Sequence, residues 1–177
     1  TFLYLFQFRE HIYEIFEEVC GARLTTNIGR IGGFERDFND IAFAKINKFL
    51  KEFPKALKEF EALLNRNRIF IDRTAGVAEV TKEAALEYSW TGPLLRATGV
   101  DYDVRVSDPY SSYQDFDFEV PVGTSGDIYD RYLVRNEEMW QSLRIIEQAM
   151  EKLKSEEKGI FHADVPEFYL PPKQEVY

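Results

Sequence analysis

Apolar residues recur at three- and four-residue steps in three stretches of the chain, which is the spacing of one face of an α-helix. The first stretch covers residues 2–20 and stops at Gly21, the second starts with Asn39 or Asp40 as its cap, and the third covers residues 125–153. The three stripes consist of Leu5, Phe8, Ile12, Ile15, Phe16 and Val19; of Ala42, Ile46, Phe49, Phe53, Leu57, Phe60 and Leu64; and of Ile128, Tyr132, Leu133, Met139, Trp140, Leu143, Ile146, Met150 and Leu153. The pattern predicts three amphipathic helical regions.

Local signals modify this picture at three places. Pro54 lies inside the second region and should kink or divide it, because proline removes a helix hydrogen bond. Residues 66–80 are ambiguous between a short strand and a helical turn. Thr81 is predicted to cap a short helix that contains Ala84.

The middle of the chain, residues 91–126, is dense in glycine, proline and serine and poor in helix formers. Polar and apolar residues alternate in DFDFEVPV, residues 115–122, which predicts a short strand. A loop region of this length inside a compact domain is usually functional or docked on a partner. The stretch TTNIGRIGGFERDF, residues 25–38, is a turn-rich connector and matches neither GxGxxG nor a P-loop.

These features predict a single domain over 1–177 of mainly α class with a small β portion. Its parts are a helical part at 1–66, a loop-rich part at 67–123, a long helix at 124–154 and an extended tail at 155–177. The chain starts on Thr1 inside an apolar pattern, so we expect an excised piece of a longer protein.

Composition narrows the function classes. The residues are 45% hydrophobic and 15% aromatic, which is far from the disordered class. The net charge of −9 argues against nucleic acid and against an anionic membrane as partners. No run approaches the ~20 apolar residues of a membrane span. The single cysteine, Cys20, excludes an intrachain disulfide and cannot by itself hold zinc or an iron–sulfur cluster.

The stretch TGPLLRATGVDYDVR, residues 91–105, places Arg96 and Arg105 among apolar residues, with Asp101 and Asp103 between them. Charges that leave water need partners, so this is either a paired structural cluster or a cradle for an anionic or polar ligand.

Two carboxylate pairs also invite interpretation as a hydrolase or metal site, Asp101 with Asp103 and Asp115 with Asp117. The arginines and tyrosines around them favour structural ion pairs instead. In the third helical region, acidic residues at helical spacing pair with arginines, as Asp127 does with Arg131. Residues alone therefore indicate no catalytic set and no metal site.

Several long blocks resemble a known family in the same order: FREHIYEIFEEVCGARLTTNIGRIGG, TGPLLRATGVDYDVR, PYSSYQDFDFEVPVGTSGDIYDRYLVRNEEMWQSLRIIEQAMEKL and YLPPKQEVY. The chain is similar to the middle of the D subunits of NADH-quinone oxidoreductase, respiratory complex I. This family is related in fold to the large subunit of nickel–iron hydrogenases, which implies long helices packed with a Gly/Pro-rich loop region. The resemblance also implies a middle fragment, with N-terminal and C-terminal sections lying outside it.

The resemblance implies an enzyme subunit of the respiratory electron-transport chain, in the quinone-reducing module of this translocase. There the subunit meets an iron–sulfur partner subunit, electrons from NADH reach quinone, and the reaction is coupled to ion translocation. The isolated fragment is expected to be inactive and to bind no cofactor itself; quinone and the partner's cluster belong to the full complex. Expected partners are the iron–sulfur subunit and other peripheral-arm subunits, at the cytoplasmic side of the inner membrane. The alternative is an interaction scaffold with no ligand site in this stretch, and a free-standing carboxylate hydrolase is a third, outlying hypothesis.

Residue by residue, the resemblance implies no catalytic, metal or quinone-binding residue here, since the family's quinone-headgroup His and Tyr lie upstream of Thr1. Many members carry a histidine where Thr25 stands, and Arg30 matches a family arginine, so both are candidates near the partner's cluster. The structural ion-pair candidates are Arg96, Asp101, Tyr102, Asp103 and Arg105.

Overall fold

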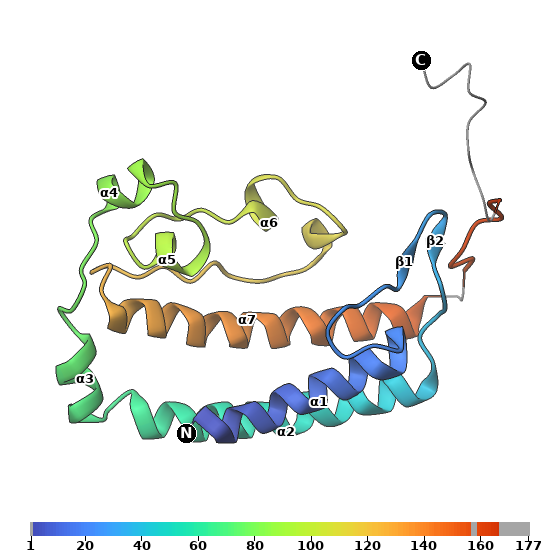
Figure 1. Cartoon of the computed structure of the whole chain (residues 1–177), viewed down its shortest axis with the longest axis horizontal. Coiled ribbons are helices and arrows are strands. Elements are labelled where there is room, and N and C mark those ends of the chain that lie inside the picture. Colours follow the sequence, from blue (N-terminus) through green and yellow to red (C-terminus); the bar gives the residue numbers. More distant parts are fainter. Residues whose placement is uncertain (1, 157–158, 167–177) are drawn as a thin grey trace, which may run out of the picture. The chain divides into compact units, whose positions relative to one another are not determined.

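The computed structural model describes residues 2–156 and 159–166, which are mostly helical (Figure 1). The elements are α1 (Phe2–Cys20), β1 (Gly29–Arg30), β2 (Gly33–Phe34), α2 (Asp40–Leu64), α3 (Arg68–Thr74), α4 (Lys82–Glu87), α5 (Gly92–Arg96), α6 (Val104–Ser107), η1 (Tyr113–Asp115) and α7 (Ile128–Ser155). The predicted class, mainly α with a small β portion, is confirmed. Among the described residues, no helix combines the length and the apolarity that crossing a membrane requires.

The chain divides into two compact units, and α2 runs from the first into the second. The first unit consists of the described residues up to Phe49 together with 159–166, and the second unit is Leu50–Glu156. The last resembling block, residues 169–177, lies outside the described residues, as does most of the predicted extended tail.

In the first unit, the GRIGG turn forms a tight hairpin in which β1 and β2 pair antiparallel. The segment bonded to this hairpin comes from far along the chain: Phe34 N donates to Phe161 O (2.8 Å) and Ala163 N donates to Gly32 O (2.9 Å). Gly33 has a φ of +142°, and a Cβ there would overlap the carbonyl oxygen of Phe161. Only glycine fits this position, because the backbone conformation and the close approach both exclude a side chain.

Helix α2 begins where the pattern predicts, because the Asn39 side chain accepts a hydrogen bond from Ala42 N (2.8 Å) as an N-cap. The helix is not divided at Pro54. Ala56 and Leu57, just after the proline, are almost fully buried. The burial of their apolar surface offsets the lost backbone hydrogen bond.

Short helices fill the stretches where the sequence pattern is ambiguous. Residues 68–74 are helical, and Asn67 caps them by accepting from Phe70 N (3.1 Å). Thr81 caps α4 by accepting from Ala84 N (3.2 Å), which confirms that prediction. Helix α7 starts at Ile128, three residues later than predicted, because Asp127 is its cap and accepts from Asp130 N (2.7 Å).

Within the second unit, α7 lies between two sets of contacts. On one side, the carboxylate of Glu61 at the end of α2 accepts from Asn136 Nδ2 (2.7 Å) and Trp140 Nε1 (2.6 Å). On the other side lies a loop layer that contains α5, α6 and η1 (Figure 1). Buried Val134, Leu143 and Met150 form the apolar part of this long helix.

The predicted strand at 115–122 is wrong for the described structure, although its backbone is partly extended. Asp117 N donates to Gln148 Oε1 (2.8 Å), and Glu119 N donates to Gln141 Oε1 (3.0 Å). Two glutamine side chains of α7 therefore satisfy backbone groups that a neighbouring strand would satisfy in a sheet. The alternation of polar and apolar residues reflects packing on a helix.

Candidate functional site

Four charged residues of the second unit meet under the loop layer, and we call them the charge cluster: Arg96, Asp103, Arg105 and Glu138. Arg96 is the last residue of α5, which packs against α7, where Glu138 lies. Asp103 caps α6 by accepting from Arg105 N (2.9 Å). The loop between α5 and α6 is thus folded so that both arginines reach the same part of α7.

Cations and anions alternate in the charge cluster. Arg105 forms a bidentate pair with Asp103, with Nε–Oδ1 and Nη2–Oδ2 distances of 3.0 Å and 2.6 Å. Arg96 bonds Glu138 directly and lies 3.4 Å from Asp103 Oδ2. The second carboxylate oxygen of Glu138 lies 3.4 Å from Arg105 Nη2. Two positive and two negative side chains therefore neutralise one another.

The charge cluster is largely out of water. The side chains of Arg96 and Asp103 are each 5% exposed, and those of Arg105 and Glu138 are 17% and 18% exposed. The Arg105 guanidinium lies 5.0 Å from the ring centre of Phe118. Arg96 Nε is buried and has no hydrogen-bond partner among the described residues. Such burial is stable only because each charge has an opposite charge beside it.

The electrostatics of the charge cluster keep the Asp103 carboxyl ionised and the Arg105 guanidinium protonated. Hydrogen bonds from the Arg105 side chain hold the pKa of the Asp103 carboxyl below its usual range, against the opposing effect of burial. The same bonds raise the pKa of Arg105. A hydrolase would need a carboxyl group with a raised pKa in an open cleft, and Asp103 is the opposite case.

The lowered pKa of Asp103 predicts how stability changes with acid. In the folded state the carboxyl stays ionised below its ordinary pKa of 3.8, so its contribution is fully present above that value and is lost as the pH falls towards the lower folded-state pKa. We expect Asp103→Asn to lower the melting temperature strongly at pH 7, and the gap to wild type to narrow below about pH 4. Thermal melts from neutral pH down through this range measure the gap. A gap that stays constant throughout would contradict a fixed Asp103 charge.

The sequence-derived candidates do not all join the charge cluster. Asp101 is exposed and has no ion pair among the described residues. Tyr102 contributes only its backbone carbonyl, which accepts from Arg96 Nη1 (3.2 Å), while its ring stays half exposed. The other acidic pair is also separated, because Asp115 pairs with Lys152 (2.7 Å) and Asp117 pairs with Arg144.

The two residues that the family resemblance predicts to lie near an iron–sulfur cluster, Thr25 and Arg30, lie in the first unit. Thr25 is exposed in the loop that follows α1. Arg30 lies in β1 and pairs with Glu35 across the hairpin (Nη2–Oε2, 2.8 Å). Hydrogen bonds from Arg30 lower the pKa of Glu35. Thr25 therefore lies in the loop that leads to the exposed hairpin, and Arg30 lies in the hairpin itself.

Sequence reasoning does not find Glu138. The predicted stripe on α7 passes through Tyr132 and Met139, on the α2 side of the helix. Val134 and Gln141 are both buried and seven residues apart, with Glu138 on the same face between them. The buried face is not apolar in the sequence, so no periodic signal there could have found Glu138.

The predicted pair of Asp127 and Arg131 does not form. Asp127 is buried and accepts from Gly76 N (2.8 Å), in addition to capping α7. Arg131 donates to the carbonyls of Gly126 (2.6 Å) and Ala78 (3.1 Å). Both side chains bind backbone and so attach the start of α7 to residues 76–80.

An open groove of 590 Å³ lies along the start of α7 and is lined by Phe60, Leu94, Ile128, Arg131, Tyr132, Arg135, Asn136 and Met139. Two of its polar side chains donate to structural partners, Tyr132 to Asn65 Oδ1 (2.6 Å) and Arg135 to Arg131 O (3.0 Å). Asn136 Oδ1 is buried and has no hydrogen-bond partner among the described residues. Burial raises the pKa of Tyr132 to about 12, so this phenol stays protonated at neutral pH. Among the described residues, no three His, Cys, Asp or Glu side chains gather as metal ligands.

The fold and the charge cluster define the class only broadly, as a mainly helical domain with a neutral, buried set of ion pairs. Sequence comparison makes the class specific. The profile of the family "Respiratory-chain NADH dehydrogenase, 49 Kd subunit" matches residues 1–177, and the chain belongs to this family.

The chain is similar to curated relatives over 99% of its length. It is 70% identical to the second D subunit of NADH-quinone oxidoreductase from Cytophaga hutchinsonii and 66% identical to the D subunit of the same enzyme from Flavobacterium johnsoniae. The D subunit of Myxococcus xanthus is 49% identical. The chain spans less than half the length of these relatives, between 42% and 45%.

Proposed function

We propose that the chain is part of the quinone-reducing module of an NADH-quinone oxidoreductase. It helps to form the interface with an iron–sulfur partner subunit, where electrons from NADH reach quinone, and the complex couples this reaction to ion translocation. The observation that carries the proposal is the match over 99% of the chain, at 70% and 66% identity, to relatives with this name. The complex would hold the chain as a peripheral subunit at the cytoplasmic side of the membrane.

The first unit offers the surface for the iron–sulfur partner. Three large apolar side chains at the hairpin and its approach are exposed: Leu24 (71%), Ile31 (86%) and Phe34 (54%). Leu24 adjoins Thr25 and Ile31 adjoins Arg30 in the sequence, and Phe34 lies in β2 of the same hairpin. Large exposed apolar side chains within one short stretch are typical of a protein interface. In this proposal the iron–sulfur cluster belongs to the partner, and the single cysteine of this chain, Cys20, could not hold one by itself.

The alternative function is a scaffold with no ligand site in this stretch. The charge cluster favours this role for the second unit, because each of its carboxylates is bound by an arginine. The two functions agree that this chain contributes contacts and leaves the redox chemistry to groups held elsewhere.

A pull-down against the recombinant iron–sulfur partner subunit, with and without its cluster, tests the proposal. We expect the chain to bind, and Ile31→Asp to weaken binding about tenfold, equivalent to ~1.4 kcal/mol, because a charge replaces an apolar contact. Arg30→Ala and Thr25→Ala then test the two sequence-derived candidates. Arg68→Ala is the control, because the Arg68 side chain is 93% exposed on α3, in the other unit.

No binding by a chain that is folded by circular dichroism would contradict this interface. Equal binding by the wild type and Ile31→Asp would place the contact away from the hairpin.

A further inference from the structure

Within residues 101–110, the side chains of residues 102–106 reverse the usual arrangement of polar and apolar groups. The charged residues Asp103 and Arg105 point into the charge cluster and are buried or nearly so. The residues that alternate with them, Tyr102, Val104 and Val106, are 45%, 45% and 56% exposed. A chain that only needed a stable surface would place these side chains the other way round.

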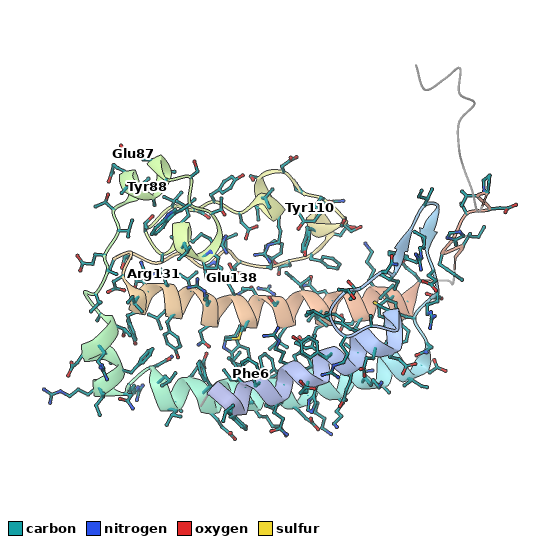
Figure 2. All side chains as sticks on the ribbon, viewed as in Figure 1. Phe6, Glu87, Tyr88, Tyr110, Arg131 and Glu138 are labelled. Atoms are coloured by element: carbon teal, nitrogen blue, oxygen red, sulfur yellow. The ribbon has the colours of Figure 1, made fainter. Side chains whose placement is uncertain are left out.

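Backbone hydrogen bonds and a ring contact fix the conformation of this exposed segment. Asp103 accepts from Ser107 N (2.9 Å) through its backbone carbonyl, and Asp108 N donates to Val104 O (3.0 Å). The ring of Tyr110, also about half exposed, packs edge-on against Tyr113 with 5.0 Å between ring centres. Figure 2 shows Tyr110 in the loop layer on the side away from α7. Turning the apolar residues inward would pull Asp103 and Arg105 out of their ion pair. The apolar side chains of this segment therefore stay exposed.

We propose that the exposed apolar side chains of this segment, Tyr102, Val104, Val106 and Tyr110, bind another subunit of the complex. The partner is a protein segment with apolar residues at its centre and Lys or Arg at its edge. The inference rests on the proposed function but concerns a surface in the second unit, separate from the hairpin of the first. Tyrosine is among the residues that are enriched at interface hot spots.

Charge complementarity selects the partner. Asp101 and Asp108 lie at the start and near the end of this segment, both exposed, and neither has an ion pair among the described residues. Because Asp103 and Arg105 neutralise each other, the exposed charge of the segment is negative. A basic edge on the partner would pair with these two aspartates.

The same two aspartates disfavour the other occupants. An anionic lipid surface would be repelled by them and by the net charge of −9. A second copy of the chain, docked through the same surface about a two-fold axis, would bring aspartates towards aspartates. A basic protein segment is the occupant that both the apolar and the charged residues fit.

Photo-crosslinking in the assembled complex tests the inference. A benzophenone amino acid replaces Val106 in the subunit that contains this chain, the complex is purified after irradiation, and the crosslinked peptides are sequenced. We expect an adduct with one other subunit, in a segment that contains apolar residues and Lys or Arg. The same amino acid at position 68, on α3, is the matched exposed control and should not crosslink to that segment.

Charge reversal gives a second readout. Asp101→Lys with Asp108→Lys should lower the yield of the adduct at least tenfold, and Asp101→Asn with Asp108→Asn should lower it less. The melting temperature of the isolated chain should not fall, because neither aspartate has an ion-pair partner inside the described structure. Unchanged yield after charge reversal would overturn the assigned partner chemistry.

The outcomes separate the two proposals. Absence of the chain from the purified complex would overturn the proposed function, and this inference with it. A chain that is present, with an adduct only to another part of its own subunit, to lipid, to a second copy or to an acidic segment, would overturn the inference alone. So would the lack of any adduct at position 106 when position 31 in the hairpin does crosslink.

Discussion

Arg96→Ala should lower the free energy of unfolding by about 3–5 kcal/mol, because it removes one of the two cations beside the buried carboxylates of Asp103 and Glu138 and leaves Arg105 alone to balance both. For a chain of this size the melting temperature should fall on the order of 10 °C. The cause would be the excess negative charge, since an apolar core of the same volume is often as stable as an intact buried ion pair. Differential scanning calorimetry and urea unfolding measure the loss.

The control is Arg144→Ala, which removes an ion pair with Asp117 in which both side chains are well exposed. An exposed pair contributes roughly 0–1 kcal/mol, so this variant should melt close to wild type. Arg96→Ala with Glu138→Ala should cost less than the sum of the single variants, because the second change removes the excess negative charge. Equal melting temperatures for Arg96→Ala and wild type would refute the buried-pair interpretation.

Gly126→Ala should destabilise the second unit by on the order of 3 kcal/mol, through a left-handed backbone of about 1–2 kcal/mol and overpacking of about 1–3 kcal/mol. Gly126 has a φ of +66°, and a Cβ there would overlap the carbonyl oxygen of Val80. Its N–H donates to Ala97 O (2.9 Å), and its carbonyl accepts from Val80 N (3.2 Å). The backbone on both sides is fixed, so a side chain must break this junction at the start of α7.

Gly92→Ala separates the two causes. Its φ of +63° is nearly the same, but a Cβ at Gly92 would meet no atom within 4 Å. We expect Gly92→Ala to show only the backbone contribution of about 1–2 kcal/mol. Urea unfolding of both variants, followed by circular dichroism of the helical signal, gives the comparison. Equal losses in the free energy of unfolding for the two variants would show that the close approach to Val80 does not contribute.

The helices are predictable because their signals are local. A stripe at three- and four-residue steps and a capping side chain lie within a few residues of each other, as at Thr81 and at Asn39. The strand expected at 115–122 rests on alternation alone, and alternation does not say whether the partner is a strand or a helix. Only the position of Gln141 and Gln148 on α7 decides it.

Part of the charge cluster could be predicted from the sequence for the same reason. Arg96, Asp103 and Arg105 lie within ten residues of one another, and their apolar surroundings indicate that they leave water. Glu138 is 42 residues from Arg96, so its role depends on how α5 packs on α7. Likewise, nothing near GRIGG in the sequence shows that Phe161 and Ala163 bond to the hairpin. Long-range contacts of these kinds are set by tertiary packing.

The neutrality of the charge cluster also constrains how this chain could change over time. Each of the four residues compensates another, so a single replacement leaves an unmatched charge in a place that water hardly reaches. An all-apolar version could be equally stable, yet every one-step route to it passes through a destabilised intermediate. The four residues are therefore expected to be retained together in descendants of this chain. The destabilised intermediates would preserve them even if they take part in no chemistry.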